Sequence, residues 1–255
     1  MPPISSNQIL REDIVTDDVK PWGRWASLGL SLIALFAGQG VALATLVWWY
    51  GLSLPHWSDL MVDGVLVILS VYIATPVQTA LLALMARPTG TSAASYLGLT
   101  LPRKRDVINV IIGIVIVTIV GAVLDAASRL LGYNPVTQFQ FDIYRIARIE
   151  GWLPWLWLAI VVVGPIGEET LFRGFLFRGW HRSPRDAWLA IIVTALLWAL
   201  SHVQYNLFFI GQVFVFGLLL GWFRFKSGST IITILLHGLL NLEAMLETVV
   251  VFNNA

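Results

Sequence analysis

The stretch WLPWLWLAIVVVGPIGEETLFRGFLF, residues 152–177, decides the fold and raises the question of function. Its length and apolar character match a helix that crosses a lipid bilayer, which needs about 20 such residues. Within it, however, stand two adjacent carboxylates and an arginine, Glu168, Glu169 and Arg173. An ionised side chain at the centre of a membrane helix costs about 2.5–3.5 kcal/mol on insertion scales, so we expect these three to face the protein interior and to be paired.

The whole chain shares this apolar composition. Of its 255 residues, 57% are hydrophobic and 12% are charged, and the mean hydropathy is +0.78. A soluble domain of this size does not need so many apolar residues to fill a core. The composition therefore predicts an all-α, multi-pass integral membrane protein in a lipid bilayer, which would be the plasma or inner membrane in a bacterium.

Charge and cysteine content exclude several functions. The net charge is +1 and no long basic run is present, whereas nucleic-acid binding needs clustered Lys and Arg on a solvated face. We therefore expect no nucleic-acid partner. The chain has no cysteine, which excludes disulfides, thiolate metal ligands and a cysteine nucleophile.

Seven segments are apolar over a length that suits a membrane helix. They lie at about 25–52, 60–86, 107–131, 152–179, 187–204, 207–225 and 229–252. If these segments alternate in direction, most of the 16 Lys and Arg residues fall on the same side as the N-terminus. Because positively charged loops stay in the cytoplasm, we predict an N-terminus inside and a C-terminus outside. Residues 1–24 would then be a cytoplasmic segment and residues 25–255 a single membrane domain.

Several features outside the polar centre have structural interpretations. Residues 87–106 should lie along the inner interface, and residues 133–151 could form a short surface helix. Asp125 and Arg129 are four residues apart, so they can pair on one helix face. The pattern GLLLG at residues 217–221 lets two helices approach closely, which indicates packing.

The charged residues of segment 152–179 divide into two kinds. Glu169 and Arg173 are four apart and can form an intrahelical pair. Glu168 is turned away by about 100° and is free to point elsewhere. Just before them, the Gly and Pro residues of 164–167 weaken the helix, so a kink or restart there could leave free backbone N–H groups near the carboxylates. One acid thus has a structural interpretation and the other is available for chemistry.

Further polar residues fall inside the later segments. His202 ends the sequence WALSH, and HGLLN places His237 and Asn241 four apart on one helix face. A single membrane histidine is more often an interhelical hydrogen bond than a catalyst. The coincidence of two histidines, an asparagine, two glutamates and an arginine in the last four segments instead favours a shared site.

These motifs resemble those of the CPBP family of intramembrane proteases, which includes the type II CAAX prenyl endopeptidases. The resemblance covers about residues 150–245 and rests on three motifs in order along the chain. These are Glu168-Glu169-x-x-x-Arg173, an aromatic-x-x-x-His ending at His202, and His237-x-x-x-Asn241. The family usually has Phe four residues before the first histidine, and this chain has Trp198, which we interpret as an exchange on a packing position.

The resemblance implies an endopeptidase that uses a glutamate to activate water. It implies Glu168 as the general base and His202 as a residue that holds the water, while His237 and Asn241 stabilise the oxyanion and Glu169 and Arg173 orient the site. The partner would be a membrane-associated or lipidated peptide or protein, with or without a prenyl group. No cofactor is required by this scheme.

Three other readings of the same residues stay open. Glu168, His202 and His237 could hold a zinc ion, although no HExxH pattern is present. A non-catalytic scaffold or regulatory binding protein could keep the polar cluster for stability. An ion- or proton-coupled transporter also uses buried Glu, Arg and His, although we find no paired broken helices in two halves.

Overall fold

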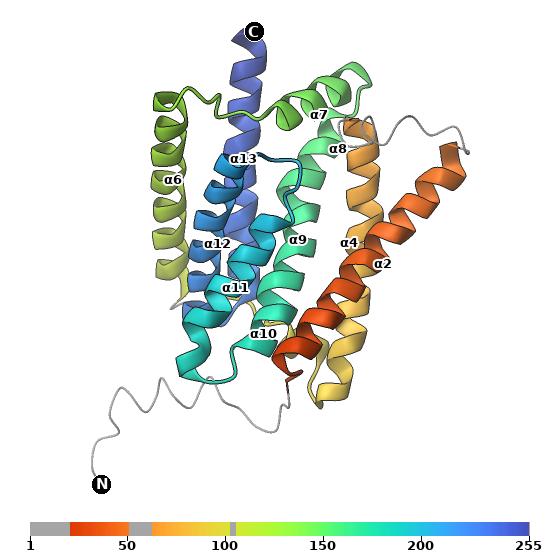
Figure 1. The fold of residues 1–255 in the computed structure, drawn as a ribbon, viewed down its shortest axis with the longest axis vertical. Helices are drawn as coiled ribbons and strands as arrows, with labels where there is room; N and C mark the ends of the chain where they lie inside the picture. Colours follow the sequence, from red (N-terminus) through yellow and green to blue (C-terminus); the bar gives the residue numbers. More distant parts are fainter. Residues whose placement is uncertain (1–20, 51–62, 103–105, 255) are drawn as a thin grey trace.

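The computed structural model describes residues 21–50, 63–102 and 106–254, and every regular element in this part of the chain is helical. The predicted all-α fold is confirmed for it, while residues 1–20 of the predicted cytoplasmic segment lie outside the described residues. The longer elements form an upright bundle, with α2 beginning at one end and α13 finishing at the other (Figure 1). They are α2 (Arg24–Tyr50), α4 (Gly64–Ala86), α6 (Asp106–Leu130), α7 (Gln138–Ile149), α11 (Ala187–Leu200), α12 (Leu207–Ser227) and α13 (Thr230–Asn254).

The charged apolar segment of residues 152–177 forms one helical column whose backbone hydrogen-bond register changes along its length. The column consists of α8 (Leu153–Leu158), η2 (Ala159–Val163), α9 (Gly164–Glu169), η3 (Thr170–Leu176) and α10 (Phe177–Trp180), of which η2 and η3 are π-helical. The column stays helical through residues 164–167, so the predicted restart of the helix is absent there.

Six of the predicted membrane helices are long and apolar enough to cross a bilayer. The exception is α11, which has 14 residues and is about 21 Å long, less than the hydrocarbon core of about 30 Å. The predicted count of seven is therefore six by this criterion. The prediction extended this segment to about residue 204, whereas the helix ends at Leu200, before the sequence SHVQ of residues 201–204.

The column lies at the centre of the bundle. Every residue of η3 is buried, and η3 contacts α2, α4, α11, α12 and α13. Such complete burial requires each polar side chain on η3 to find its partner inside the protein. The centre of the fold and the polar centre of the sequence are thus the same place.

Small residues let α12 pack closely against α11, as the GLLLG pattern predicts. A Cβ atom added to Gly217 would lie 2.9 Å from the Ala195 Cβ, and one added to Gly221 would lie 3.1 Å from Ile191 Cγ2. The first distance is closer than Cβ atoms approach in proteins, so Gly217 fixes the separation of the two helices. This contact brings the end of α11 against the column.

The surface helix predicted within residues 133–151 is α7. Its first turn is closed by a reciprocal capping box between Thr137 and Gln140, and it buries Ile143, Tyr144 and Ala147 against α4, α8 and α13. In Figure 1 it lies across the end of the bundle where α13 finishes. It therefore covers one end of the polar centre.

Candidate active site

Glu169 and Arg173 form a buried ion pair, as their spacing predicts. Arg173 Nη1 donates to Glu169 Oε1 over 2.8 Å, and both side chains are fully buried. The guanidinium also donates through Nη2 to the Gly217 carbonyl over 3.2 Å and lies 4.5 Å from the centre of the Trp198 ring. Because both charges are fully buried, each of them would be very unfavourable without the other.

Glu168 has different surroundings although it is the next residue. It is half-buried and lines a cavity, and Trp198 Nε1 donates to its Oε2 over 2.5 Å. The described residues record no other hydrogen bond to this carboxylate, so Oε1 is available to a molecule in the cavity. The predicted division between a structural and an available acid corresponds to this geometry.

The partners of the two histidines define their tautomers. His202 Nδ1 lies 2.9 Å from the Trp198 carbonyl, and His237 Nδ1 lies 3.0 Å from Glu169 Oε1. A carbonyl oxygen and a carboxylate paired with arginine can only accept, so both Nδ1 atoms carry the proton and donate. The Nε2 atom of each ring is then the nitrogen that remains for another partner.

Asn241 is held by the π-helical register of the column. The Gly164 N–H bonds to the Ala159 carbonyl, five residues back, which releases the Ile160 carbonyl from its usual partner. Pro165 cannot replace that partner because proline has no N–H. Asn241 Nδ2 instead donates to the Ile160 carbonyl over 2.7 Å, so the sequence 164–165 prepares the acceptor that anchors Asn241.

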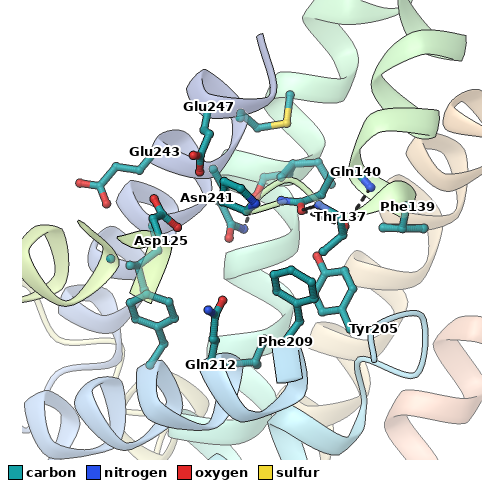
Figure 2. Close-up of a pocket in the computed structure, with 18 of the residues that line it drawn as sticks. Asp125, Thr137, Phe139, Gln140, Tyr205, Phe209, Gln212, Asn241, Glu243 and Glu247 are labelled. Atoms are coloured by element: carbon teal, nitrogen blue, oxygen red, sulfur yellow. Dashed lines mark hydrogen bonds between the residues drawn. The ribbon is translucent and has the colours of Figure 1, made fainter. Parts of the chain in front are cut away.

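One cavity of about 1080 Å³ connects four of the six predicted site residues. Glu168, His202, His237 and Asn241 lie on its wall, whereas Glu169 and Arg173 lie behind it. The cavity reaches the end of the bundle that α7 covers, because Thr137 and Gln140 also line it, as Figure 2 shows. It is large enough for a peptide segment as well as water.

A second group of acids lies farther along the same cavity. Figure 2 shows Asp125, Glu243 and Glu247 on one side of it. Arg129 Nη2 lies 2.6 Å from Glu247 Oε1 on α13, and the described residues contain no Asp125–Arg129 ion pair, so the predicted pair within α6 is wrong. The spacing permits that pair, but α13 packs against α6 and supplies a competing carboxylate.

Sequence reasoning missed three residues of the site. Trp198 was interpreted only as packing. Gln78 Nε2 donates to the Gly167 carbonyl over 2.9 Å from the neighbouring α4, and Tyr205 stacks on His202 at 5.6 Å between ring centres. A glutamine inside an otherwise apolar segment was a signal for Gln78, whereas Tyr205 gave none because it follows the end of α11.

Of the two remaining histidines, His181 does not line this cavity. His56 lies outside the described residues. His181 follows α10 at the opposite end of the column, where burial, together with Arg224 and Arg178, lowers the pKa of its imidazole. A lowered pKa keeps this imidazole neutral, and its ring packs against those of Phe177 and Phe225.

The proposed zinc set does not assemble as a cluster. Within residues 21–50, 63–102 and 106–254, no three His, Cys, Asp or Glu side chains are grouped so that they could hold a metal ion. Glu168 and His202 each contact Trp198, and His237 contacts Glu169. The arrangement is a hydrogen-bonded network around an indole ring.

Fold and site together define a multi-pass helical membrane protein with a polar cavity at its centre. Residues 150–242 match the family described as type II CAAX prenyl endopeptidase Rce1-like, and the chain therefore carries a domain of this CPBP family. The resemblance predicted from the three motifs is confirmed.

One relative and the solved structures complete the comparison. A protein of Escherichia coli described as an uncharacterized 24.3 kDa protein is 37% identical over 82 residues, which cover 31% of this chain and 38% of that protein. The match thus spans well under half of the relative. No solved structure matches the chain.

Proposed function

We propose that this protein is an intramembrane endopeptidase in which Glu168 activates water to hydrolyse peptide bonds of membrane-associated or lipidated peptides. The proposal rests on one observation, that two adjacent carboxylates have different surroundings. Glu169 is buried in an ion pair, while Glu168 lies on the wall of a peptide-sized cavity with one oxygen free of hydrogen bonds from the described residues. Membership of the CAAX protease family supports the same reaction.

In this mechanism the Glu168 carboxylate acts as general base. It takes a proton from water as the water oxygen bonds to the carbonyl carbon of the substrate, and the carbonyl electrons move to its oxygen. When that oxyanion collapses, the C–N bond breaks and the proton passes from Glu168 to the leaving nitrogen. The products are a carboxylic acid and an amine.

The two histidines have different roles because their partners differ. His202 donates to a neutral carbonyl, so its Nε2 lone pair can accept a hydrogen bond from the water. His237 donates from Nδ1 to the Glu169 carboxylate, and with a second proton on Nε2 its ring can also donate to the oxyanion. The second N–H of the Asn241 amide completes the oxyanion site, while Glu169 and Arg173 hold His237 in place.

We also propose that residues 25–255 form one domain with the N-terminus inside and the C-terminus outside. The basic residues beside α10, η4 (Pro184–Asp186) and the C-terminal end of α12 lie opposite the end that α7 covers. Under the positive-inside rule the cavity then faces the non-cytoplasmic side.

The proposal is tested by digesting a library of membrane-derived and lipidated peptides with detergent-purified protein and identifying products by mass spectrometry. Wild type is compared with Glu168→Gln, each with and without a chelator, and with Glu150→Gln as an exposed control. Cleavage that survives chelator and is lost only in Glu168→Gln supports the proposal. Loss with chelator supports a metal enzyme, and absence of any cleavage by the wild type favours a scaffold or transporter.

A further inference from the structure

We propose that Trp198 is a positioning residue that anchors the Glu168 carboxylate through its indole N–H and the His202 imidazole through its backbone carbonyl. The inference rests on the proposed function, because it assigns a role to Trp198 in that reaction. It also changes the interpretation of this position, which sequence reasoning treated as an aromatic exchange within the core.

The indole N–H fixes one of the two carboxylate oxygens. Nε1 donates to Glu168 Oε2 over 2.5 Å, and a hydrogen bond to an ionised carboxylate is stronger than one to a neutral acceptor. Because this is the one hydrogen bond that the described residues give Glu168, removing it would leave the carboxylate free to rotate. With the bond in place, the position of Oε2 also fixes where Oε1 of the same carboxylate lies.

The ring itself has little room to turn. Trp198 is 3% exposed, and the Arg173 guanidinium covers it at 4.5 Å from the ring centre. Its ring lies edge-on to that of His237 at 5.0 Å. Gly217 on α12 permits the close approach, since a Cβ there would lie 3.2 Å from Trp198 Cε3. The donor is thus held by a cation–π contact and by close packing.

The same residue holds the second group proposed to contact water. The Trp198 carbonyl accepts from His202 Nδ1 over 2.9 Å, which leaves His202 Nε2 as an acceptor. A single residue at the end of α11 therefore sets the relative positions of Glu168 and His202. A base and the group that holds its water must be aligned closely for a fast reaction.

A phenylalanine at this position would preserve the packing but could not donate. Phe also has an aromatic face for Arg173 and an edge for His237, and its backbone carbonyl could still hold His202. The one interaction that Phe lacks is the N–H···O bond to Glu168. Trp198→Phe is therefore a selective test of the indole donor.

The kinetic test compares Trp198→Phe with Trp188→Phe, a control on the same helix whose side chain is 64% exposed. On a peptide that the wild type cleaves, we expect kcat of Trp198→Phe to fall about tenfold or more, because a hydrogen bond to a charged group is lost. KM should stay within about twofold and Trp188→Phe should match the wild type. An unchanged kcat in Trp198→Phe would overturn the proposal.

A spectroscopic test does not depend on activity. In protein with ¹⁵N-labelled indoles, the Trp198 Nε1–H resonance is assigned by its loss in Trp198→Phe, and it should move when Glu168 is changed to Gln while the Trp188 resonance stays in place. A resonance that does not move would show that the bond is absent and would overturn the proposal. If the resonance moves but no peptide is cleaved, the proposed function fails and the anchor remains.

Discussion

At the scale of single residues, two neighbouring glutamates have different surroundings in the protein. Glu169 lies behind the cavity wall, bonded to Arg173 and His237, whereas Glu168 faces the cavity and bonds to Trp198. The 100° turn between successive helical positions separates their environments. Substitutions at the two positions should therefore affect different properties.

We expect Glu169→Gln to destabilise the fold. The substitution leaves the fully buried Arg173 guanidinium without a counter-charge, and breaking a buried pair in this way costs about 3–5 kcal/mol. The midpoint of thermal unfolding in detergent should fall by roughly 6 °C or more. The exposed Glu150→Gln serves as control, and a midpoint equal to that of the wild type would show that the pair is not essential to the fold.

The local part of this site could be predicted from sequence, and the part between helices could not. Glu169 and Arg173 are four residues apart, so helix geometry alone brings them together. The bond from Trp198 to Glu168 joins residues 30 apart, and that from Gln78 to Gly167 joins residues 89 apart. Such contacts depend on the rotation and separation of helices, which a hydropathy pattern does not specify.

At the scale of elements, the two π-helical segments of the column release backbone carbonyls that side chains then use. In η2 the Ile160 carbonyl receives Asn241. In η3 the Phe177 N–H bonds to the Phe172 carbonyl, and the Arg173 carbonyl accepts from Arg224 Nε over 2.9 Å. A change of helical register thus ties the column to α13 and α12, as is frequent for π-segments at functional sites.

We expect Asn241→Leu to affect both the column and the reaction. The Ile160 carbonyl loses its donor, and a buried acceptor left without a partner costs about 1–3 kcal/mol. Turnover should fall as well because the proposed oxyanion site loses its amide. Thermal unfolding and peptide cleavage measured on the same preparation check both effects, and a variant with wild-type stability and wild-type turnover would refute this role.

The packing of α11 against α12 gives a paired prediction. Gly217→Ala should destabilise the protein by about 1–3 kcal/mol, because its Cβ would lie 2.9 Å from the Ala195 Cβ. Gly211→Ala, on the same helix with no neighbouring atom within 4 Å of an added Cβ, should be neutral or stabilising by up to about 1 kcal/mol. Equal unfolding midpoints for the two variants would contradict this account of the helix contact.

Hydropathy located the helices correctly but not all of their ends. Six of the seven predicted apolar segments form helices that are long enough to cross a bilayer, because burial in lipid demands long apolar runs. The prediction placed the end of α11 beyond Ser201 and His202, whereas the backbone turns at these two polar residues. His202, just after this turn, lines the cavity, so the error falls at a residue of the proposed site.

At the scale of the whole molecule, the proposed orientation rests on the asymmetric distribution of charge. Arg185 lies in the exposed turn before α11, and Glu150 lies exposed at the other end of the bundle, beside α7. The absence of cysteine lets a single introduced cysteine report its side of the membrane. A membrane-impermeant maleimide should label Glu150→Cys in intact cells and Arg185→Cys only after permeabilisation. The reverse pattern would place the cavity on the cytoplasmic side.

We propose that Glu168 activates water while its neighbour Glu169 supports the fold. Both roles are tested by measuring kcat and the thermal unfolding midpoint of Glu168→Gln beside the wild type, on the best peptide from the library. We expect kcat to fall by about 10²–10⁴-fold, because a general base is lost, while the unfolding midpoint stays close to that of the wild type. Wild-type turnover in folded Glu168→Gln protein would show that Glu168 is not the base.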